Sequence, residues 1–169
     1  MSTITLKGQP IHTIGQLPIT GDVAPEFNLT KDDFSEIKLD DLLGKTIILS
    51  IFPSIDTSVC ARSTRVFNES ATKLPNTSVV CISADLPFAL KRFCAAEGLD
   101  NIIMTSTYRH PEFGENYGVT IIDGDLKGLL SRAVVVINPE GRVIYSEQVP
   151  EIAQEPRYEQ VLAAITSGE

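Results

Sequence analysis

The chain has 169 residues and a mass of 18.4 kDa, a length that predicts one domain. Apolar residues make up 43% and charged residues 21%, values that are typical of a globular protein and not of a disordered one. The formal net charge is −8, so the surface repels nucleic acids and anionic membranes, and we expect neither as a partner. The longest apolar runs are far shorter than the roughly 20 residues that cross a bilayer.

The three cysteines are an odd number and do not fit a secreted disulfide scaffold. The N-terminal residues contain no basic segment followed by an apolar stretch, so we expect no signal peptide. Together these features predict a cytoplasmic protein with reduced thiols.

In chain order, the first 20 residues predict a small hairpin, and residues 27–39 are compatible with short strands around the polar segment KDDFSE. Continuous apolar runs and a turn at 138–141 predict the later strands, which are residues 45–52, 78–83, 102–105, 132–138 and 142–148. The predicted helices are residues 58–74, 86–97 and 156–165. We expect Asp85 to cap the second of these helices and Gly98 to end it.

Buried strands that alternate with helices, followed by an antiparallel hairpin, predict an α/β fold with a mixed central sheet flanked by helices. This order describes a thioredoxin-like core. We therefore predict one thioredoxin-like domain over residues 1–169, to which residues 1–20 add an N-terminal β-hairpin.

Cys60 follows a buried strand, a proline and a short loop, so it is expected in the first turn of a helix. Unpaired N–H groups and the positive end of the helix dipole favour a thiolate there, but a helix terminus contributes only about 0.3–1 kcal/mol. A free cysteine is about 3% thiolate at pH 7, so hydrogen bonds and a cation must add to this effect. Arg132, directly before a buried strand, is a better candidate for the cation than Arg62 or Arg65. On spacing alone, an inert buried cysteine is an equally good interpretation of Cys60.

The segment FPSIDTSVC resembles the active-site segment of peroxiredoxins, P-x-x-x-T-x-x-C, with Pro53, Thr57 and Cys60 in the three fixed positions. The segments ISADLPFALKRFCAAEGL and LKGLLSRAVVVI and the N-terminal hairpin resemble the thiol peroxidase subfamily of bacterial atypical two-cysteine peroxiredoxins. The resemblance covers essentially the whole chain.

This resemblance implies an enzyme that reduces hydrogen peroxide and organic hydroperoxides without a metal or organic cofactor. Cys60 would be the peroxidatic cysteine, and its thiolate would become a sulfenic acid. Thr57 would hydrogen-bond the thiolate and the peroxide, Pro53 would shield the sulfur from water, and Arg132 would hold thiolate and peroxide together. Cys94 would be the resolving cysteine that forms an intrachain disulfide with Cys60, and thioredoxin would reduce it. The resemblance also implies a homodimer.

The two helices that carry Cys60 and Cys94 are separate, so we expect local unwinding of one or both before their sulfurs can bond. Cys81 lies in a strand that is apolar on both faces and is expected to be inert, and His110 is expected to cap a surface turn. The spacing of cysteines and histidines predicts no metal site. Two other functions stay open: a non-catalytic redox sensor, and a thiol–disulfide oxidoreductase, which normally needs the C-x-x-C pair that is absent at Cys60.

Overall fold

The computed structural model describes residues 1–167, so the last two residues of the predicted domain, 168–169, lie outside the described part. The strands are β1 (Thr3–Leu6), β2 (Gln9–His12), β3 (Asn28–Lys31), β4 (Glu36–Lys38), β5 (Thr46–Ile51), β6 (Thr77–Ser83), β7 (Ile103–Ser106), β8 (Ala133–Ile137) and β9 (Val143–Gln148). The helices are α1 (Leu39–Leu42), α2 (Ser58–Ala71), α3 (Pro87–Glu97), α4 (Glu112–Asn116) and α5 (Tyr158–Ser167).

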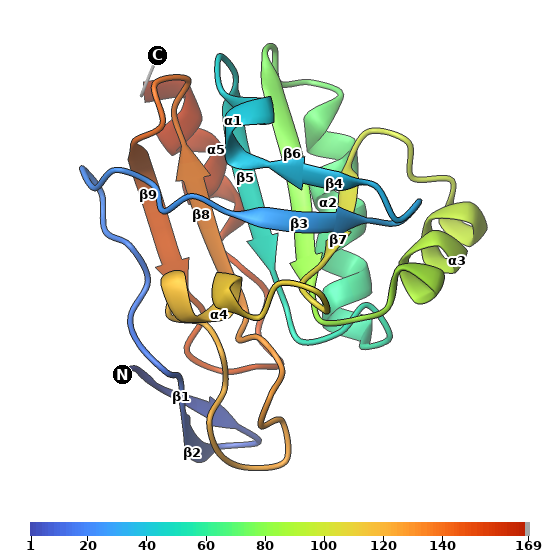
Figure 1. The fold of residues 1–169 in the computed structure, drawn as a ribbon. Coiled ribbons are helices and arrows are strands. Elements are labelled where there is room, and N and C mark those ends of the chain that lie inside the picture. The colour runs from blue at the N-terminus through green and yellow to red at the C-terminus, as the bar shows by residue number, and fades with distance from the viewer. Residues whose placement is uncertain (168–169) are drawn as a thin grey trace.

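Seven strands form one mixed sheet in the order β4-β3-β7-β6-β5-β8-β9, while β1 and β2 form a separate antiparallel pair (Figure 1). Strands β5, β6 and β7 are parallel, β8 pairs antiparallel with β5, and β9 pairs antiparallel with β8. The predicted α/β thioredoxin-like fold, with its mixed sheet and N-terminal hairpin, is confirmed.

The register of the central strands brings three loops to one edge of the sheet. Ile51, the last residue of β5, lies opposite Ile82 of β6 and Ala133 of β8. Because β6 is parallel to β5, the segments that follow both strands leave the sheet at this edge. Because β8 is antiparallel to β5, Arg132, the residue before β8, lies at the same edge.

Alternate residues of β5 pack into cores on opposite faces of the sheet, as the period of two in a strand requires. Ile47 and Leu49 belong to the core that includes side chains of α1 and α4. Ile48 belongs to the other core, where Phe67 of α2 and Val161 of α5 cover the sheet. Figure 1 shows α2 and α5 on this far side of the sheet.

The predicted elements match the structure with small shifts at their ends. Helix α2 ends at Ala71, three residues before the predicted end, and Gly98 ends α3 in a left-handed conformation with φ of +67°. Helices α1 and α4 were not predicted, because helices of four and five residues show no helical period.

The prediction that Asp85 caps α3 is wrong. The N-cap position of α3 is Leu86, and no side chain caps the helix. The carboxylate of Asp85 instead accepts hydrogen bonds from the loop that follows β5.

The β1–β2 pair packs on the rest of the chain through a small apolar cluster. Ile4 and Ile11 from the pair contact Ile121 and Ile152, and all four side chains are buried. No helix within residues 1–167 has the length and apolar character needed to cross a membrane.

Candidate active site

Cys60 lies in the first turn of α2, and its side chain is buried with 0% exposure. Thr57 is the N-cap residue, so Cys60 is the third helical residue. The Thr57 side chain makes no capping hydrogen bond to the first-turn N–H groups of α2. The positive end of the α2 dipole is therefore available to an anion at Cys60.

Arg132 places a guanidinium against the sulfur. Its Nη1 donates a hydrogen bond of 3.1 Å to Cys60 Sγ, and its Nε donates one of 2.6 Å to the carbonyl of Ile152. Arg132 is only 2% exposed. Within residues 1–167, no ion pair gives Arg132 a carboxylate partner. A buried cation needs an anion to offset its lost hydration, and the Cys60 sulfur is the contact that can become one.

The strands β8 and β9 fix the backbone from which the Arg132 side chain extends. The carbonyl of Arg132 accepts hydrogen bonds from Val149 N at 2.9 Å and from Gln148 Nε2 at 3.0 Å. Since Ala133 is paired with Ile51, Arg132 lies directly beside the end of β5. The sheet register thus brings the arginine to the cysteine.

Pro53 and Thr57 belong to the loop between β5 and α2. Pro53 is buried, whereas Thr57 is exposed. The Thr57 hydroxyl donates to the carbonyl of Ser54 at 2.9 Å, and the Thr57 N–H donates to the same carbonyl at 3.2 Å. The hydroxyl proton is therefore directed at the loop carbonyl in this arrangement, and it must turn to donate to the sulfur.

Arg62 and Arg65 form ion pairs elsewhere on the surface. Arg62 Nη1 lies 3.3 Å from Glu155 Oε2, and Arg65 makes two hydrogen bonds, of 3.0 and 2.7 Å, to Glu97. Each of these two guanidinium groups is thus paired with a carboxylate and not with Cys60. Arg132 is the arginine that the structure brings to Cys60.

Cys94 lies in α3, is partly buried and has a free thiol. Burial, followed by the negative charges of Asp32 and Asp100, raises the pKa of Cys94 to about 11. Because this pKa lies far above 7, Cys94 in the folded helix is a protonated thiol at neutral pH. The structure does not join Cys94 to Cys60, which lies in a different helix and also has a free thiol.

Cys81 is a core residue of β6, with 0% exposure. Burial, with a further contribution from Cys94, raises the pKa of its thiol well above the ordinary value, although a hydrogen bond with Thr64 opposes the shift. A thiol held in its protonated form is a poor nucleophile.

Comparisons with known proteins identify the family of this chain. The Redoxin family model matches residues 19–162. The chain belongs to the redoxin family. The thiol peroxidases of Mycobacterium bovis and Mycobacterium tuberculosis are 54% identical to this redoxin over 165 residues, which cover 98% of this chain and 99% of theirs.

Two solved structures resemble this redoxin over nearly its whole length. A peroxiredoxin-like protein from Aquifex aeolicus is 37% identical, with a TM-score of 0.93 over 99% of this chain and 97% of its own. A thiol peroxidase from Chromobacterium violaceum is 24% identical, with a TM-score of 0.91 over 98% of this chain and 96% of its own. The predicted membership of the peroxiredoxin family is confirmed.

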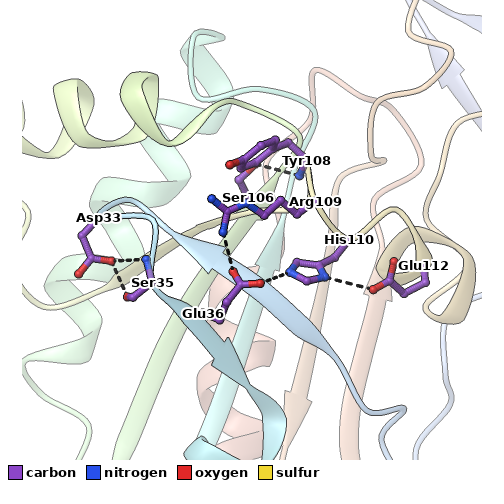
Figure 2. A network of polar contacts seen from close by, with 8 residues as sticks. All are labelled: Asp33, Ser35, Glu36, Ser106, Tyr108, Arg109, His110 and Glu112. Atoms are coloured by element: carbon purple, nitrogen blue, oxygen red, sulfur yellow. Dashed lines mark hydrogen bonds and ion pairs between the residues drawn. The ribbon is translucent and has the colours of Figure 1, made fainter.

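His110 of this redoxin lies in a polar network on the surface (Figure 2). Its Nε2 lies 2.5 Å from Glu36 Oε1, and its Nδ1 lies 3.2 Å from Glu112 Oε1. Arg109 Nη1 lies 3.7 Å from the same Glu36 carboxylate. The backbone N–H of His110 closes a turn on Thr107 O, so the ring itself joins β4 to α4 rather than capping the turn.

Sequence reasoning missed two groups that position the residues of the candidate active site. The carbonyl of Ile152 orients Arg132, and a backbone carbonyl leaves no signal in a sequence. Asp85 Oδ1 accepts from Ser54 Oγ at 2.8 Å, and its Oδ2 accepts from Ile55 N at 2.7 Å. This contact had a signal, because parallel strands β5 and β6 deliver their following residues to one sheet edge.

Proposed function

We propose that this redoxin is a thiol peroxidase that reduces hydrogen peroxide and organic hydroperoxides with Cys60. The observation that carries the proposal is the contact of 3.1 Å between the Arg132 guanidinium and Cys60 Sγ, at the start of a helix and away from solvent. The 54% identity to mycobacterial thiol peroxidases over nearly the full length supports the same activity.

In the first step the Cys60 thiolate attacks the terminal oxygen of the hydroperoxide. A sulfur–oxygen bond forms and the O–O bond breaks, which oxidises the sulfur to a sulfenic acid and reduces the peroxide by two electrons. The leaving oxygen takes a proton and departs as water or an alcohol. Arg132 stabilises the negative charge that moves from sulfur to oxygen. The Thr57 hydroxyl turns away from Ser54 and donates a hydrogen bond to the reacting atoms.

Pro53 keeps water from the sulfur during this step. It is buried in the turn that connects β5 to α2, whereas Thr57 in the same loop faces solvent. Because Cys60 itself is fully buried, peroxide reaches the sulfur through a small movement of this loop.

In the second step the Cys94 sulfur attacks the sulfenic acid of Cys60. The disulfide forms and the sulfenic oxygen leaves as water. A disulfide needs Cα atoms within about 7 Å, so the first turn of α2, helix α3 or both unwind to bring the sulfurs together. Unwinding also exposes the thiol of Cys94 to water, which lowers its pKa from about 11 and makes the thiolate accessible.

In the third step a dithiol protein of the thioredoxin type reduces the disulfide. Its two thiols become a disulfide, and Cys60 and Cys94 return to thiols.

We further propose that the chain acts as a single domain over residues 1–169, forms a homodimer and works in the cytoplasm, where thiols are kept reduced. The three unpaired cysteines are compatible with that compartment.

The test is a peroxidase assay coupled to thioredoxin and thioredoxin reductase, with mass spectrometry after one equivalent of cumene hydroperoxide. The proposal expects catalytic turnover and a disulfide that joins Cys60 to Cys94. Slow stoichiometric oxidation without turnover would instead favour a redox sensor, and a disulfide that includes Cys81 would contradict the assigned pair.

A further inference from the structure

Asp85 lies between β6 and α3, and its carboxylate is surrounded by hydrogen-bond donors. Ser54 Oγ donates to one carboxylate oxygen at 2.8 Å. The other oxygen accepts from Ile55 N and from Ser83 Oγ, each at 2.7 Å. Two of these three donors belong to the loop between β5 and α2, which leads to Cys60 and is called the peroxidatic loop below, and the third belongs to the last residue of β6.

Through Ser54, the carboxylate of Asp85 determines where the start of α2 lies. The carbonyl of Ser54 accepts both the N–H and the hydroxyl of Thr57, and Ser54 Oγ accepts the N–H of Asp56 at 3.2 Å. Thr57 is in turn the N-cap of α2, and its carbonyl accepts the N–H of Ala61. The position of Cys60 thus depends on hydrogen bonds that end at Asp85.

Asp85 also lies two residues before Pro87, the first residue of the helix that carries Cys94. Any movement that separates the peroxidatic loop from the start of α3 must break the hydrogen bonds that join Asp85 to Ser54 and Ile55. A hydrogen bond to a charged group in a partly buried site contributes more than one between neutral groups.

Two exposed ion pairs also join α3 to the peroxidatic loop and to α2. Arg92 Nη2 lies 3.4 Å from Asp56 Oδ1, and Arg65 Nη2 lies 2.7 Å from Glu97 Oε1. Exposed pairs of this kind are screened by water and salt and contribute little. The partly buried carboxylate of Asp85 is therefore the stronger connection.

We propose that Asp85 is a positioning residue that holds the peroxidatic loop in its peroxide-reactive arrangement and opposes the unwinding that disulfide formation needs. The inference rests on the proposed function, because it takes Cys60 and Cys94 as the reacting pair. It predicts opposite effects on two steps: loss of the carboxylate slows the oxidation of Cys60 and speeds the formation of the disulfide. A purely structural residue would slow both.

The experiment follows both steps by quench-flow and mass spectrometry, with cumene hydroperoxide as the probe, because the chain has no tryptophan for a fluorescence signal. We expect Asp85→Asn to lower the rate of Cys60 oxidation about tenfold and to raise the rate of disulfide formation about tenfold, from the typical strength of hydrogen bonds to a carboxylate. Ser54→Ala removes one of the same bonds from the other side and should shift both rates in the same directions. It also keeps the inference testable if Asp85→Asn does not fold.

The matched control is Asp123→Asn. The Asp123 carboxylate also accepts a backbone N–H and binds a side chain, both from His12, and it has no hydrogen bond to the peroxidatic loop or to α3. It should leave both rates at the wild-type value. Asp85→Asn with unchanged rates, or with both rates lowered, would overturn the inference alone. Wild-type protein that forms no Cys60–Cys94 disulfide would overturn the proposed function and this inference with it.

Discussion

Arg132 Nη1 donates a hydrogen bond of 3.1 Å to Cys60 Sγ, although the two residues are 72 positions apart in the chain. Both side chains are closed off from solvent, with 2% and 0% exposure. Little water lies between two such buried groups, so the guanidinium interacts with charge that develops on the reacting atoms more strongly than a surface arginine would.

Arg132→Met keeps an unbranched apolar side chain, although a shorter one, and removes the charge and the hydrogen-bond donors. We expect the rate constant for peroxide reduction to fall about 100-fold or more, the typical loss on removing a donor that stabilises developing charge. Stopped-flow measurement with cumene hydroperoxide checks this. Arg132→Lys keeps the charge but loses the planar guanidinium that binds both Cys60 and the carbonyl of Ile152. Its rate should therefore lie between those of the wild type and Arg132→Met. A wild-type rate for Arg132→Met would remove the guanidinium from the mechanism.

Cys60 and Cys81 offer a matched pair of buried cysteines with different chemistry. Cys60→Ser should abolish peroxide reduction because a serine hydroxyl at this position cannot form a sulfenic acid. Cys81→Ser should keep the peroxidase rate within a factor of two but lower the free energy of unfolding by about 1–3 kcal/mol, since it buries a hydroxyl in an apolar core. Peroxidase assays and urea unfolding separate the two effects. An inactive Cys81→Ser that still folds would show that the nucleophile is assigned to the wrong residue.

The sequence predicted the strand, loop and helix around Cys60 because each has a strong local signal. The apolar run before Pro53 is a buried strand, and the spacing of Thr57 and Cys60 after it fits a helix start. Arg132 was also predictable as the cation, because an arginine directly before a strand buried on both faces has few partners other than an anion at the sheet edge.

Other features depended on contacts that the local sequence does not encode. Asp85 has the preference of an N-cap residue, but the parallel alignment of β5 and β6 placed Ser54 and Ile55 within its reach, and these donors took its carboxylate. The direction of the Thr57 hydroxyl depends on where the Ser54 carbonyl lies, which the loop conformation decides. The network that joins His110 to Glu36 links residues 74 positions apart and needs the sheet order to be known.

Thr57 tests whether the hydroxyl that now donates to Ser54 also serves the reaction. Thr57→Val keeps the shape of the side chain and removes the proton donor, so we expect about a 100-fold lower rate of Cys60 oxidation. Thr57→Ser keeps the hydroxyl and should stay within about tenfold of wild type in the same measurement. Equal rates for the valine and serine variants would mean that the hydroxyl only shapes the loop.

Cys94→Ser should react once with peroxide and then stop, because the proposed resolving thiol is gone and the remaining thiol, Cys81, is buried in β6. Mass spectrometry should find one added oxygen on Cys60 in this variant, and the thioredoxin-coupled assay should find no sustained turnover. Normal coupled turnover would exclude Cys94 from the reaction. Cys81→Ser again serves as the control, since it removes a cysteine while leaving the proposed pair intact.

The raised pKa of Cys94 makes the stability of the fold sensitive to alkaline pH. Burial and the charges of Asp32 and Asp100 raise this pKa to about 11 from an ordinary value of 9.0. Between these two values an unfolded chain loses the thiol proton while the folded chain retains it. Stability from this group is therefore fully present below pH 9 and is lost as the pH rises toward 11.

Thermal unfolding in a Cys60→Ser background isolates this effect from disulfide chemistry. Adding Cys94→Ser should make the midpoint less dependent on pH between 9 and 11, because the titrating thiol is gone. Asp100→Asn removes one of the charges that raise the pKa of Cys94, so it should weaken the pH dependence, while Asp125→Asn, an exposed carboxylate outside this site, should leave it unchanged. If the Cys94→Ser variant shows the same pH dependence as its parent, the thiol of Cys94 is not the group that titrates.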